Sequence, residues 1–253
     1  MFLVEDGVVT KLKKYLKVFS TLKIPQLKFS FKDCPLHGKS VFVRLNNSML
    51  GVRCCVCGGA PIATSIAIVL QDQVSDYKNK THYELSSRGA FFEFLKKNVI
   101  NLTFSEYLDD VKPGEYSNGI QCQDIQKLTF DDSLFDVVTS TEVFEHVPDD
   151  ASGFAEVFRV LRSGGVFIFT VPLFHEECTV TRAVLEHDKI KYLLEPTYHD
   201  DSIRGAGKVL VFRDYGMDIR ERLTNAGFRD VEIVNVPDSG GFGFNREVIV
   251  ARK

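Results

Sequence analysis

Residues 76–253 show two alternating hydrophobic periods. Short apolar runs of strand length are separated by segments whose apolar residues recur every three or four positions, as they do along one face of a helix. This alternation predicts an α/β domain in which helices cover a doubly wound sheet. The predicted strands are residues 81–85, 101–106, 119–123, 134–140, 166–171, 228–234 and 246–251, and the predicted helices are 89–98, 148–161 and 217–226.

The helix predicted at 148–161 carries the clearest signals. Its first turn holds a proline followed by Asp149 and Asp150, whose carboxylates complement the positive end of the helix dipole. A pair of glycines at 164–165 is predicted to end it. The apolar run 166–171 has no polar face, which is typical of a strand buried on both sides.

Residues 1–75 have a different pattern and are predicted to form an N-terminal part, separate from a main domain at 76–253. Apolar residues at helical spacing between 8 and 22, with lysines on the opposite face, predict a basic helix. A solvated surface explains such a face more often than nucleic-acid contact does. Two apolar runs, 41–45 and 49–53, flank a polar turn and predict a hairpin.

Two short motifs in this N-terminal part have the form of zinc knuckles. Each has a ligand, a two-residue spacer, a second ligand and a glycine, which lets two side chains converge on one ion. The predicted ligands are Cys34, His37, Cys54 and Cys57. Cys55 is spare because it would leave a one-residue spacer. Four protein ligands leave no position for a substrate, so the predicted Zn²⁺ is structural; a free-thiol cluster or a disulfide is the alternative.

Composition and charge narrow the class of protein. The chain has 253 residues, 44% of them apolar, which is enough for a large core. Residues 1–60 hold ten Lys and Arg against three Asp and Glu, a net +7, which leaves −10 for the rest of a chain whose total is −3. No stretch approaches 18 uncharged apolar residues and no cleavable leader is recognisable, so the sequence predicts a cytoplasmic protein without a membrane segment.

The sequence of residues 120–174 resembles the second half of class I S-adenosylmethionine (SAM) dependent methyltransferases of the type 11-like group. The similarity extends to about 30–250 in a bacterial subgroup that joins a cysteine-rich N-terminal segment to this domain. It implies a Rossmann-like, seven-stranded methyltransferase sheet with SAM as cofactor. The motifs that carry it are Asp124, Phe135-Asp136-Val137-Val138, Glu145-His146-Val147-Pro148, Leu161-Arg162-Ser163-Gly164-Gly165, Glu195–His199 and Val209–Gly216.

The resemblance also implies a cofactor site, because ligands of such sheets bind at the carboxyl ends of the strands. Glu106 is the counterpart of the carboxylate that takes the ribose hydroxyls, and Asp124 is that of the residue that meets the adenine. The first turn departs from the family pattern: it keeps one of three glycines and is one residue shorter. The implied cofactor-binding residues are Glu84, Ser86, Ser87, Arg88, Gly89, Glu106, Asp124, Ile125, Ser140 and Thr141.

Methyl transfer from SAM requires an aligned acceptor, exclusion of water, and a proton acceptor when the nucleophile is a hydroxyl. A long insertion at about 172–208 follows the fifth strand, where insertions commonly form a lid or an acceptor pocket. Within it, His199 and then His175 are the predicted catalytic bases, whereas His146 is predicted to be structural.

These patterns favour an O-methyltransferase, less strongly an N-methyltransferase, of a small molecule or a saccharide. One alternative is an RNA methyltransferase that contacts RNA through the basic N-terminal segment and the zinc ribbon. A second alternative, based on the glycine-poor turn, is a non-catalytic module that binds SAM or a partner. The sequence predicts neither the acceptor nor the oligomeric state.

Overall fold

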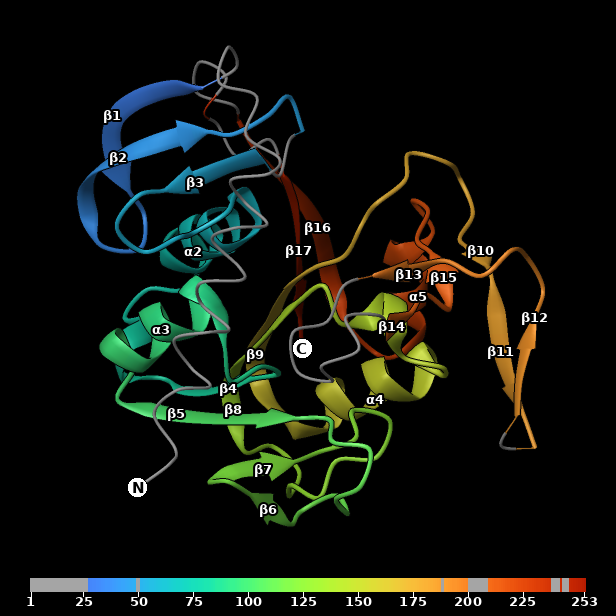
Figure 1. The fold of residues 1–253 in the computed structure, drawn as a ribbon. Coiled ribbons are helices and arrows are strands. Elements are labelled where there is room, and N and C mark those ends of the chain that lie inside the picture. Colours follow the sequence, from blue (N-terminus) through green and yellow to red (C-terminus); the bar gives the residue numbers. More distant parts are fainter. Residues whose placement is uncertain (1–26, 49–50, 188, 200–208, 238–241, 243–245) are drawn as a thin grey trace, which may run out of the picture.

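A mostly parallel sheet forms the centre of the molecule (Figure 1). The structure is a computed structural model that describes residues 27–48, 51–187, 189–199, 209–237, 242 and 246–253. The strand order is β16-β17-β9-β8-β4-β5-β7-β6. Its strands are β4 (Thr81–Glu84), β5 (Asn101–Glu106), β6 (Tyr116–Ser117), β7 (Ile120–Cys122), β8 (Phe135–Thr141), β9 (Leu161–Thr170), β16 (Arg229–Val236) and β17 (Arg246–Arg252).

Five neighbouring strands, β7, β5, β4, β8 and β9, run parallel. β17 is antiparallel to both of its neighbours, β9 and β16. Strand order reverses between β4 and β8, which makes the carboxyl ends of these two strands the switch point where ligands bind. The predicted doubly wound, Rossmann-like sheet is confirmed. It has an eighth strand because β6 forms a short hairpin with β7 at the edge.

Helices cover both faces of the sheet (Figure 1). α2 and α3 pack together on one face, and α4 and α5 pack together on the other. The chain passes from α4 directly into β9, so the glycine pair 164–165 lies inside the strand segment and does not end the helix as predicted. The helices are α2 (Pro61–Gln73), α3 (Gly89–Asn98), α4 (Asp150–Val160) and α5 (Ile219–Asn225), with 3-10 turns η3 (Tyr77–Asn79) and η4 (Phe144–His146).

Helix α2 was not predicted from the sequence. It lies between the N-terminal ribbon and the sheet, and even its polar residues Thr64 and Ser65 are buried. A helix that is buried nearly all round lacks the polar face on which periodicity depends. Pro61 at its first turn was the remaining signal.

The N-terminal ribbon has three antiparallel strands, β1 (Lys28–Cys34), β2 (Gly38–Arg44) and β3 (Val52–Cys54). The predicted hairpin corresponds to β2 and β3, while β1 was not foreseen. Residues from the ribbon, α2 and the sheet share one hydrophobic cluster. The division at residue 75 stays a prediction, and α2, on its N-terminal side, packs on the central sheet. The predicted helix at 8–22 lies outside the described residues, as do half of the Lys and Arg residues of segment 1–60.

Aromatic side chains fill the opposite face of the sheet beneath α4. The rings of Phe167 and Phe169 stack with their centroids 4.2 Å apart, and those of Phe144 and Phe154 stack at 4.5 Å. A Cβ at Gly153 would lie 3.0 Å from the ring of Phe144, so glycine allows this close approach. The packing fixes η4, which carries Phe144, against the first turns of α4.

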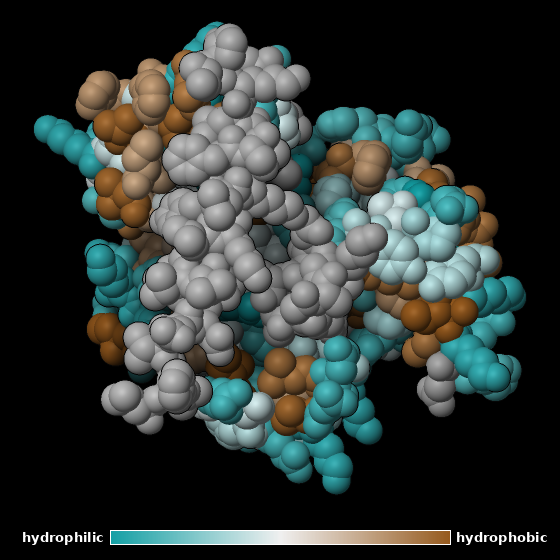
Figure 2. Space-filling view, viewed as in Figure 1, coloured by the Kyte–Doolittle hydropathy of each residue, from teal (hydrophilic) through white to brown (hydrophobic). Residues whose placement is uncertain are grey.

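The insertion after β9 consists of short hairpins. β10 (Val180–Thr181) pairs with β15 (Arg213–Asp214), β11 (Ala183–Glu186) with β12 (Lys189–Tyr192), and β13 (Tyr198–His199) with β14 (Val209–Leu210). The β11–β12 hairpin projects from the body and carries exposed apolar side chains (Figure 2). Among the described residues, no helix is long and apolar enough to cross a membrane.

Candidate active site

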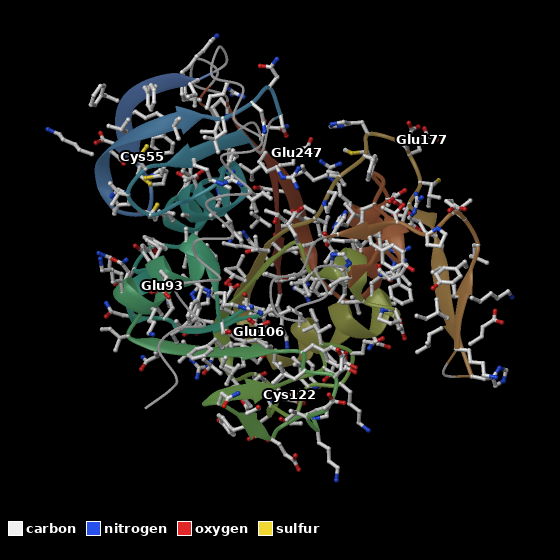
Figure 3. All side chains as sticks on the ribbon, in the orientation of Figure 1. Cys55, Glu93, Glu106, Cys122, Glu177 and Glu247 are labelled. Atoms are coloured by element: carbon white, nitrogen blue, oxygen red, sulfur yellow. The ribbon has the colours of Figure 1, made fainter. Side chains whose placement is uncertain are left out.

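The carboxylate of Glu106, at the end of β5, organises the turn that follows β4. Glu106 is 7% exposed, and Figure 3 labels it in the interior of the molecule. Its Oε1 accepts hydrogen bonds from the Ser87 backbone N–H (2.7 Å) and the Ser87 hydroxyl (2.8 Å), and lies 3.5 Å from Arg88 Nε. Ser86 Oγ also lies 3.5 Å from this oxygen. The side-chain contacts of Glu106 with the described residues all use Oε1, which leaves Oε2 for a ligand.

A pocket of about 290 Å³ opens beside this carboxylate. The turn after β4 forms one side of it, and the β6–β7 hairpin forms the other. Polar and apolar groups both line it, as expected of a site that takes a sugar and a ring. The lining residues are Ser87, Arg88, Glu106, Leu108, Ser117, Asn118 and Ile120.

Gly89 is the remaining glycine of the predicted cofactor turn, and its backbone requires glycine. Its φ of +89° lies in the left-handed region that favours glycine. α3 begins at this residue, and the first turn has no side-chain cap from Arg88. The first N–H groups of α3 are therefore available to an anion at the edge of the pocket.

Glu84, at the end of β4, lies deeper than Glu106. It is 1% exposed, and its carboxyl group accepts a hydrogen bond from the hydroxyl of Thr139. Burial raises the pKa of Glu84 to about 8; the bond from Thr139 lowers it, and the charge of Glu106 raises it. At neutral pH the group is therefore mostly protonated. Its role as a cofactor ligand stays a prediction, because it does not line the pocket.

This raised pKa makes the folded state bind a proton more tightly than the unfolded state, where the ordinary value is 4.5. The stabilisation is complete below the ordinary value and is lost as the pH rises through about 8. We expect Glu84→Gln, which stays neutral, to flatten the fall of the melting temperature over this range. Thermal unfolding across these pH values measures it. Glu93→Gln, at an exposed position on α3, should keep the wild-type slope; equal slopes in both variants would contradict the assignment.

The residues predicted to meet the adenine and the methionine lie at the ends of β7 and β8, which are separated in the sheet by β4 and β5. Asp124 follows β7, and its Oδ1 accepts hydrogen bonds from the backbone N–H (2.9 Å) and the side-chain amide (3.0 Å) of Gln126. Ile125 is buried in the core beneath α4. Ser140 and Thr141 end β8, and the buried Ser140 hydroxyl has no hydrogen-bond partner among the described residues.

Buried polar atoms without partners gather around this edge. Three further side chains at this edge have buried oxygens without a hydrogen-bond partner among the described residues. They are the hydroxyl of Thr170 at the end of β9, Oε1 of Glu142 and both carboxylate oxygens of Glu145. Buried polar groups are normally hydrogen-bonded, so a concentration of exceptions marks a place where a ligand or an ion completes the bonding.

The insertion is fixed to the loop between β8 and α4. Phe212 N–H donates to the Glu145 carbonyl (2.8 Å), and the guanidinium of Arg213 donates to the carbonyls of Phe144 (3.1 Å), Val147 (2.5 Å) and Pro148 (2.6 Å). Arg213 is 4% exposed. These bonds hold the β13–β14 hairpin, and with it His199, against η4.

The two predicted catalytic histidines lie in different surroundings. His199 Nδ1 is 3.5 Å from Glu145 Oε1, and its ring lies edge-on to that of His146, with the centroids 4.9 Å apart. His175 is 75% exposed and faces Glu247, with 3.6 Å between Nε2 and Oε1. Their catalytic roles remain predictions, but of the two only His199 belongs to a cluster of chemically active groups.

Burial and charge couple Glu145 to His199. Burial raises the pKa of Glu145, and the Glu145 carboxylate, 3.5 Å away, raises the pKa of His199. The sequence indicated Glu145 only as part of a family motif and gave it no role in the site; in the structure it is 1% exposed. The signal was the pair of acidic residues, Glu142 and Glu145, directly before a histidine at the end of a strand.

The sequence model of the methyltransferase-domain family matches residues 85–169, which run from the end of β4 to β9. Residues 85–169 form a methyltransferase domain. The predicted resemblance is thus confirmed for this segment.

Curated relatives of the methyltransferase domain act on different acceptors. The sarcosine/dimethylglycine N-methyltransferase of Halorhodospira halochloris is 33% identical over 93 residues, 36% of this chain and 33% of that protein. The ubiquinone biosynthesis O-methyltransferase of Coxiella burnetii is 33% identical over 90 residues, 32% of this chain and 38% of that protein. The chain thus spans about a third of the length of these relatives.

Among solved structures, DesVI of Streptomyces venezuelae aligns with a TM-score of 0.49 and 14% identity. The alignment covers 75% of this chain and 91% of that one.

The residues at the edge of the methyltransferase domain fit SAM. The cofactor needs a carboxylate for its ribose, a donor for its methionine carboxylate and a close approach of backbone. Glu106 Oε2, the first turn of α3 beside Arg88, and Gly89 meet these needs. The hydroxyl of Ser140, buried and without a described partner, lies on the next strand along the edge.

The four predicted zinc ligands converge on one point in the ribbon, away from the methyltransferase domain's pocket. Their ligand atoms all lie within 4.8 Å of one another. Cys34 Sγ and Cys57 Sγ are 3.9 Å apart, close to the ~3.8 Å expected of two thiolates on a tetrahedral Zn²⁺ with bonds of ~2.3 Å. Figure 3 labels Cys55 on the ribbon; its thiol is exposed and does not belong to the group.

Proposed function

We propose that this protein is a SAM-dependent methyltransferase that transfers a methyl group to an oxygen of a small molecule or a saccharide. The observation that carries the proposal is the set of buried hydroxyl and carboxylate groups at the carboxyl ends of β8 and β9 that have no hydrogen-bond partner among the described residues. A decayed, non-binding domain would have no reason to keep these groups buried. Burying these groups without hydrogen bonds costs free energy, and this cost is offset only when a ligand supplies the missing partners.

In this proposal Glu106 receives the ribose hydroxyls through Oε2. Asp124, held by Gln126, receives the adenine amino group. Arg88 and the first turn of α3 bind the methionine carboxylate, because both offer donors and positive charge there. SAM supplies an activated methyl group, so the chain's own task is to align the acceptor, exclude water and manage the acceptor's proton.

Oxygen is favoured as the acceptor atom by the group next to the site. A hydroxyl must lose a proton on methylation, and Glu145 with His199 offers two coupled titratable groups at the end of β8. The matched relatives include enzymes named for transfer to nitrogen and to oxygen. In this proposal the insertion that carries His199 forms the acceptor side of the site.

A second proposal concerns the ribbon: Cys34, His37, Cys54 and Cys57 bind a structural Zn²⁺. It is supported by the convergence of the four ligand atoms and by a donor set of three sulfurs and one nitrogen, which suits Zn²⁺. The metal would join the turn after β1 to the turn after β3.

Calorimetric titration with S-adenosylhomocysteine, the stable product, tests the proposed cofactor site. We expect binding in the micromolar range, and a loss of roughly 10–100-fold in Glu106→Gln, because a hydrogen bond to a charged group contributes about 1.5–3 kcal/mol. Glu93→Gln on the exposed side of α3 is the matched control and should bind like the wild type. Thermal unfolding of each variant checks that the turn after β4 stays folded. Absence of binding to the wild type would overturn the proposal.

A further inference from the structure

Glu145, His146 and His199, here termed the Glu145 cluster, present three potential ligand atoms to one point. These atoms all lie within 4.8 Å of one another. Glu145 Oε1 is 3.5 Å from His199 Nδ1 and 3.6 Å from His146 Nε2. We propose that the Glu145 cluster binds a divalent first-row transition-metal ion, and that this ion holds the acceptor hydroxyl. The second half of this proposal rests on the proposed methyltransferase function.

The buried carboxylate of Glu145 receives no hydrogen bond from the described residues. Glu145 is 1% exposed, and neither of its oxygens has a hydrogen-bond partner among the described residues. A buried polar group left in this way costs about 1–3 kcal/mol, and more when it is charged. A cation between Glu145 and the two imidazoles would remove this cost. The distances of 3.5 and 3.6 Å between Glu145 Oε1 and the two ring nitrogens are compatible with ligands of one ion.

The ring of His146 is oriented as a metal ligand. Its Nδ1 lies 2.8 Å from the carbonyl oxygen of Leu210, and because a carbonyl only accepts, Nδ1 carries the proton. When this ring binds a metal, the lone pair on Nε2, the atom that faces Glu145, is the one that would serve as the ligand. Metal-bound histidines are commonly fixed by this kind of hydrogen bond from the other ring nitrogen.

The backbone around the cluster is fixed before any ion arrives. The Glu145 carbonyl accepts from Phe212 N–H, and Arg213 binds the carbonyls on both sides of the η4 turn. His199 comes from a different part of the chain, on the β13–β14 hairpin. Such anchoring holds ligands at productive distances without a large ordering cost.

A second acidic residue, Glu142, precedes Glu145 by three positions and is paired with an arginine. Glu142 has a φ of +54°, which is strained for a residue with a side chain. Its Oε1 is buried and without a described partner, while Oε2 accepts from Arg246 (2.7 Å). Arg246 thus neutralises Glu142, and the carboxylate of Glu145 is left to attract a cation.

The donor set limits the kind of ion. Two imidazoles and one carboxylate suit Mn²⁺, Fe²⁺, Co²⁺ or Zn²⁺, whereas Mg²⁺ and Ca²⁺ prefer oxygen alone. Three protein ligands leave coordination positions open, in contrast to the four-ligand site of the ribbon. The open positions would take one oxygen, or two adjacent oxygens, of the acceptor.

A hydroxyl bound to such an ion ionises more readily. Its proton passes to solvent, its oxygen forms a bond to the methyl carbon, and the bond between that carbon and sulfur breaks with the electron pair going to sulfur. His199 then serves as a ligand, and the ion takes over the task of making the hydroxyl acidic. Because the cluster follows the end of β8, it lies at the ligand edge of the sheet.

Mn²⁺ titration followed by electron paramagnetic resonance tests the site, since Mn²⁺ binds thiolate sites poorly and the ribbon can keep its zinc. The full-length protein, freed of loosely held metal by dialysis, is compared with Glu145→Gln and His199→Ala. We expect one Mn²⁺ site in the wild type and affinity at least tenfold weaker in both variants. His187→Asn is the matched control, because His187 lies in the same insertion, is exposed and has a φ of +49° that asparagine tolerates.

The outcomes separate this proposal from the previous one. A wild type that binds no Mn²⁺, or that binds it as tightly as Glu145→Gln does, overturns the metal site and leaves a Glu145–His199 ion pair. Binding of S-adenosylhomocysteine is measured on the same samples, and we expect it to change less than threefold in Glu145→Gln. If the wild type binds Mn²⁺ but not S-adenosylhomocysteine, the metal site stands and the proposed function fails. Thermal unfolding of each variant identifies any that fails to fold.

Discussion

Replacing Cys57 by serine is expected to remove one equivalent of zinc from the purified protein and to unfold the ribbon. The Cys57 thiol is one of four ligand atoms that converge within 4.8 Å. Because structural zinc sites contribute on the order of 10 kcal/mol to folding, loss of one ligand removes most of the force that closes the two knuckles. Elemental analysis gives the zinc content, and hydrogen exchange gives the protection of residues 27–60.

Cys55→Ser is the matched control for this experiment. Cys55 lies two residues away, is exposed and does not belong to the ligand group. It should retain zinc and protection, whereas Cys57→Ser loses both and keeps a folded central sheet. Because Phe42 and Cys54 share a hydrophobic cluster with α2, we also expect faster exchange in α2. Stoichiometric zinc in Cys57→Ser would rule out the four-ligand assignment.

Arg213→Met is expected to lower stability by about 3–5 kcal/mol, the range found when one partner of a buried ionic network is removed. The guanidinium donates to the carbonyls of Phe144, Val147 and Pro148, and lies 3.6 Å from Asp150. Methionine fills similar space but supplies no donor, so the carbonyls would be left unpaired. For a chain of this size the expected fall in melting temperature is roughly 10 °C, measured by circular dichroism.

Arg162→Met tests whether burial is the cause. Arg162 pairs with Asp136 at 3.2 Å, but its side chain is 44% exposed, and exposed pairs contribute about 0–1 kcal/mol. A small change in melting temperature is therefore expected. Equal losses in the two variants would mean that Arg213 is no more than an ordinary surface arginine. A selective loss would establish the link between the insertion and η4 on which the position of His199 depends.

The order of the main strands and helices was predictable because each element has a local signature. β5 and α3 coincide with their predicted ranges, β17 is one residue longer at its end, and β8 begins and ends one residue later than predicted. The turn after β4 could also be located, since Gly89 follows closely on the strand predicted at 81–85. What the pattern did not reveal was α2, which is buried between two layers and so has no polar face.

The zinc-ligand group illustrates the same distinction at a site. Its two halves have local spacing that can be read in the sequence, and the structure brings the four ligand atoms together as that spacing predicts. The Glu145 cluster has no such spacing, because His199 belongs to an insertion far along the chain from Glu145. A catalytic role of His199 could be predicted from the sequence, but its contact with Glu145 could not.

The sequence by itself therefore determined the type of domain, the order of its elements and the edge of the sheet at which ligands bind. These features depend on hydrophobic period and on short motifs, which act over a few residues. Tertiary structure alone decided that Glu106 binds the turn after β4, that Arg213 fixes the insertion to η4, and that Glu145 lies buried beside two histidines. The physical reason is that these are contacts between distant segments, set by how layers pack and not by local periodicity.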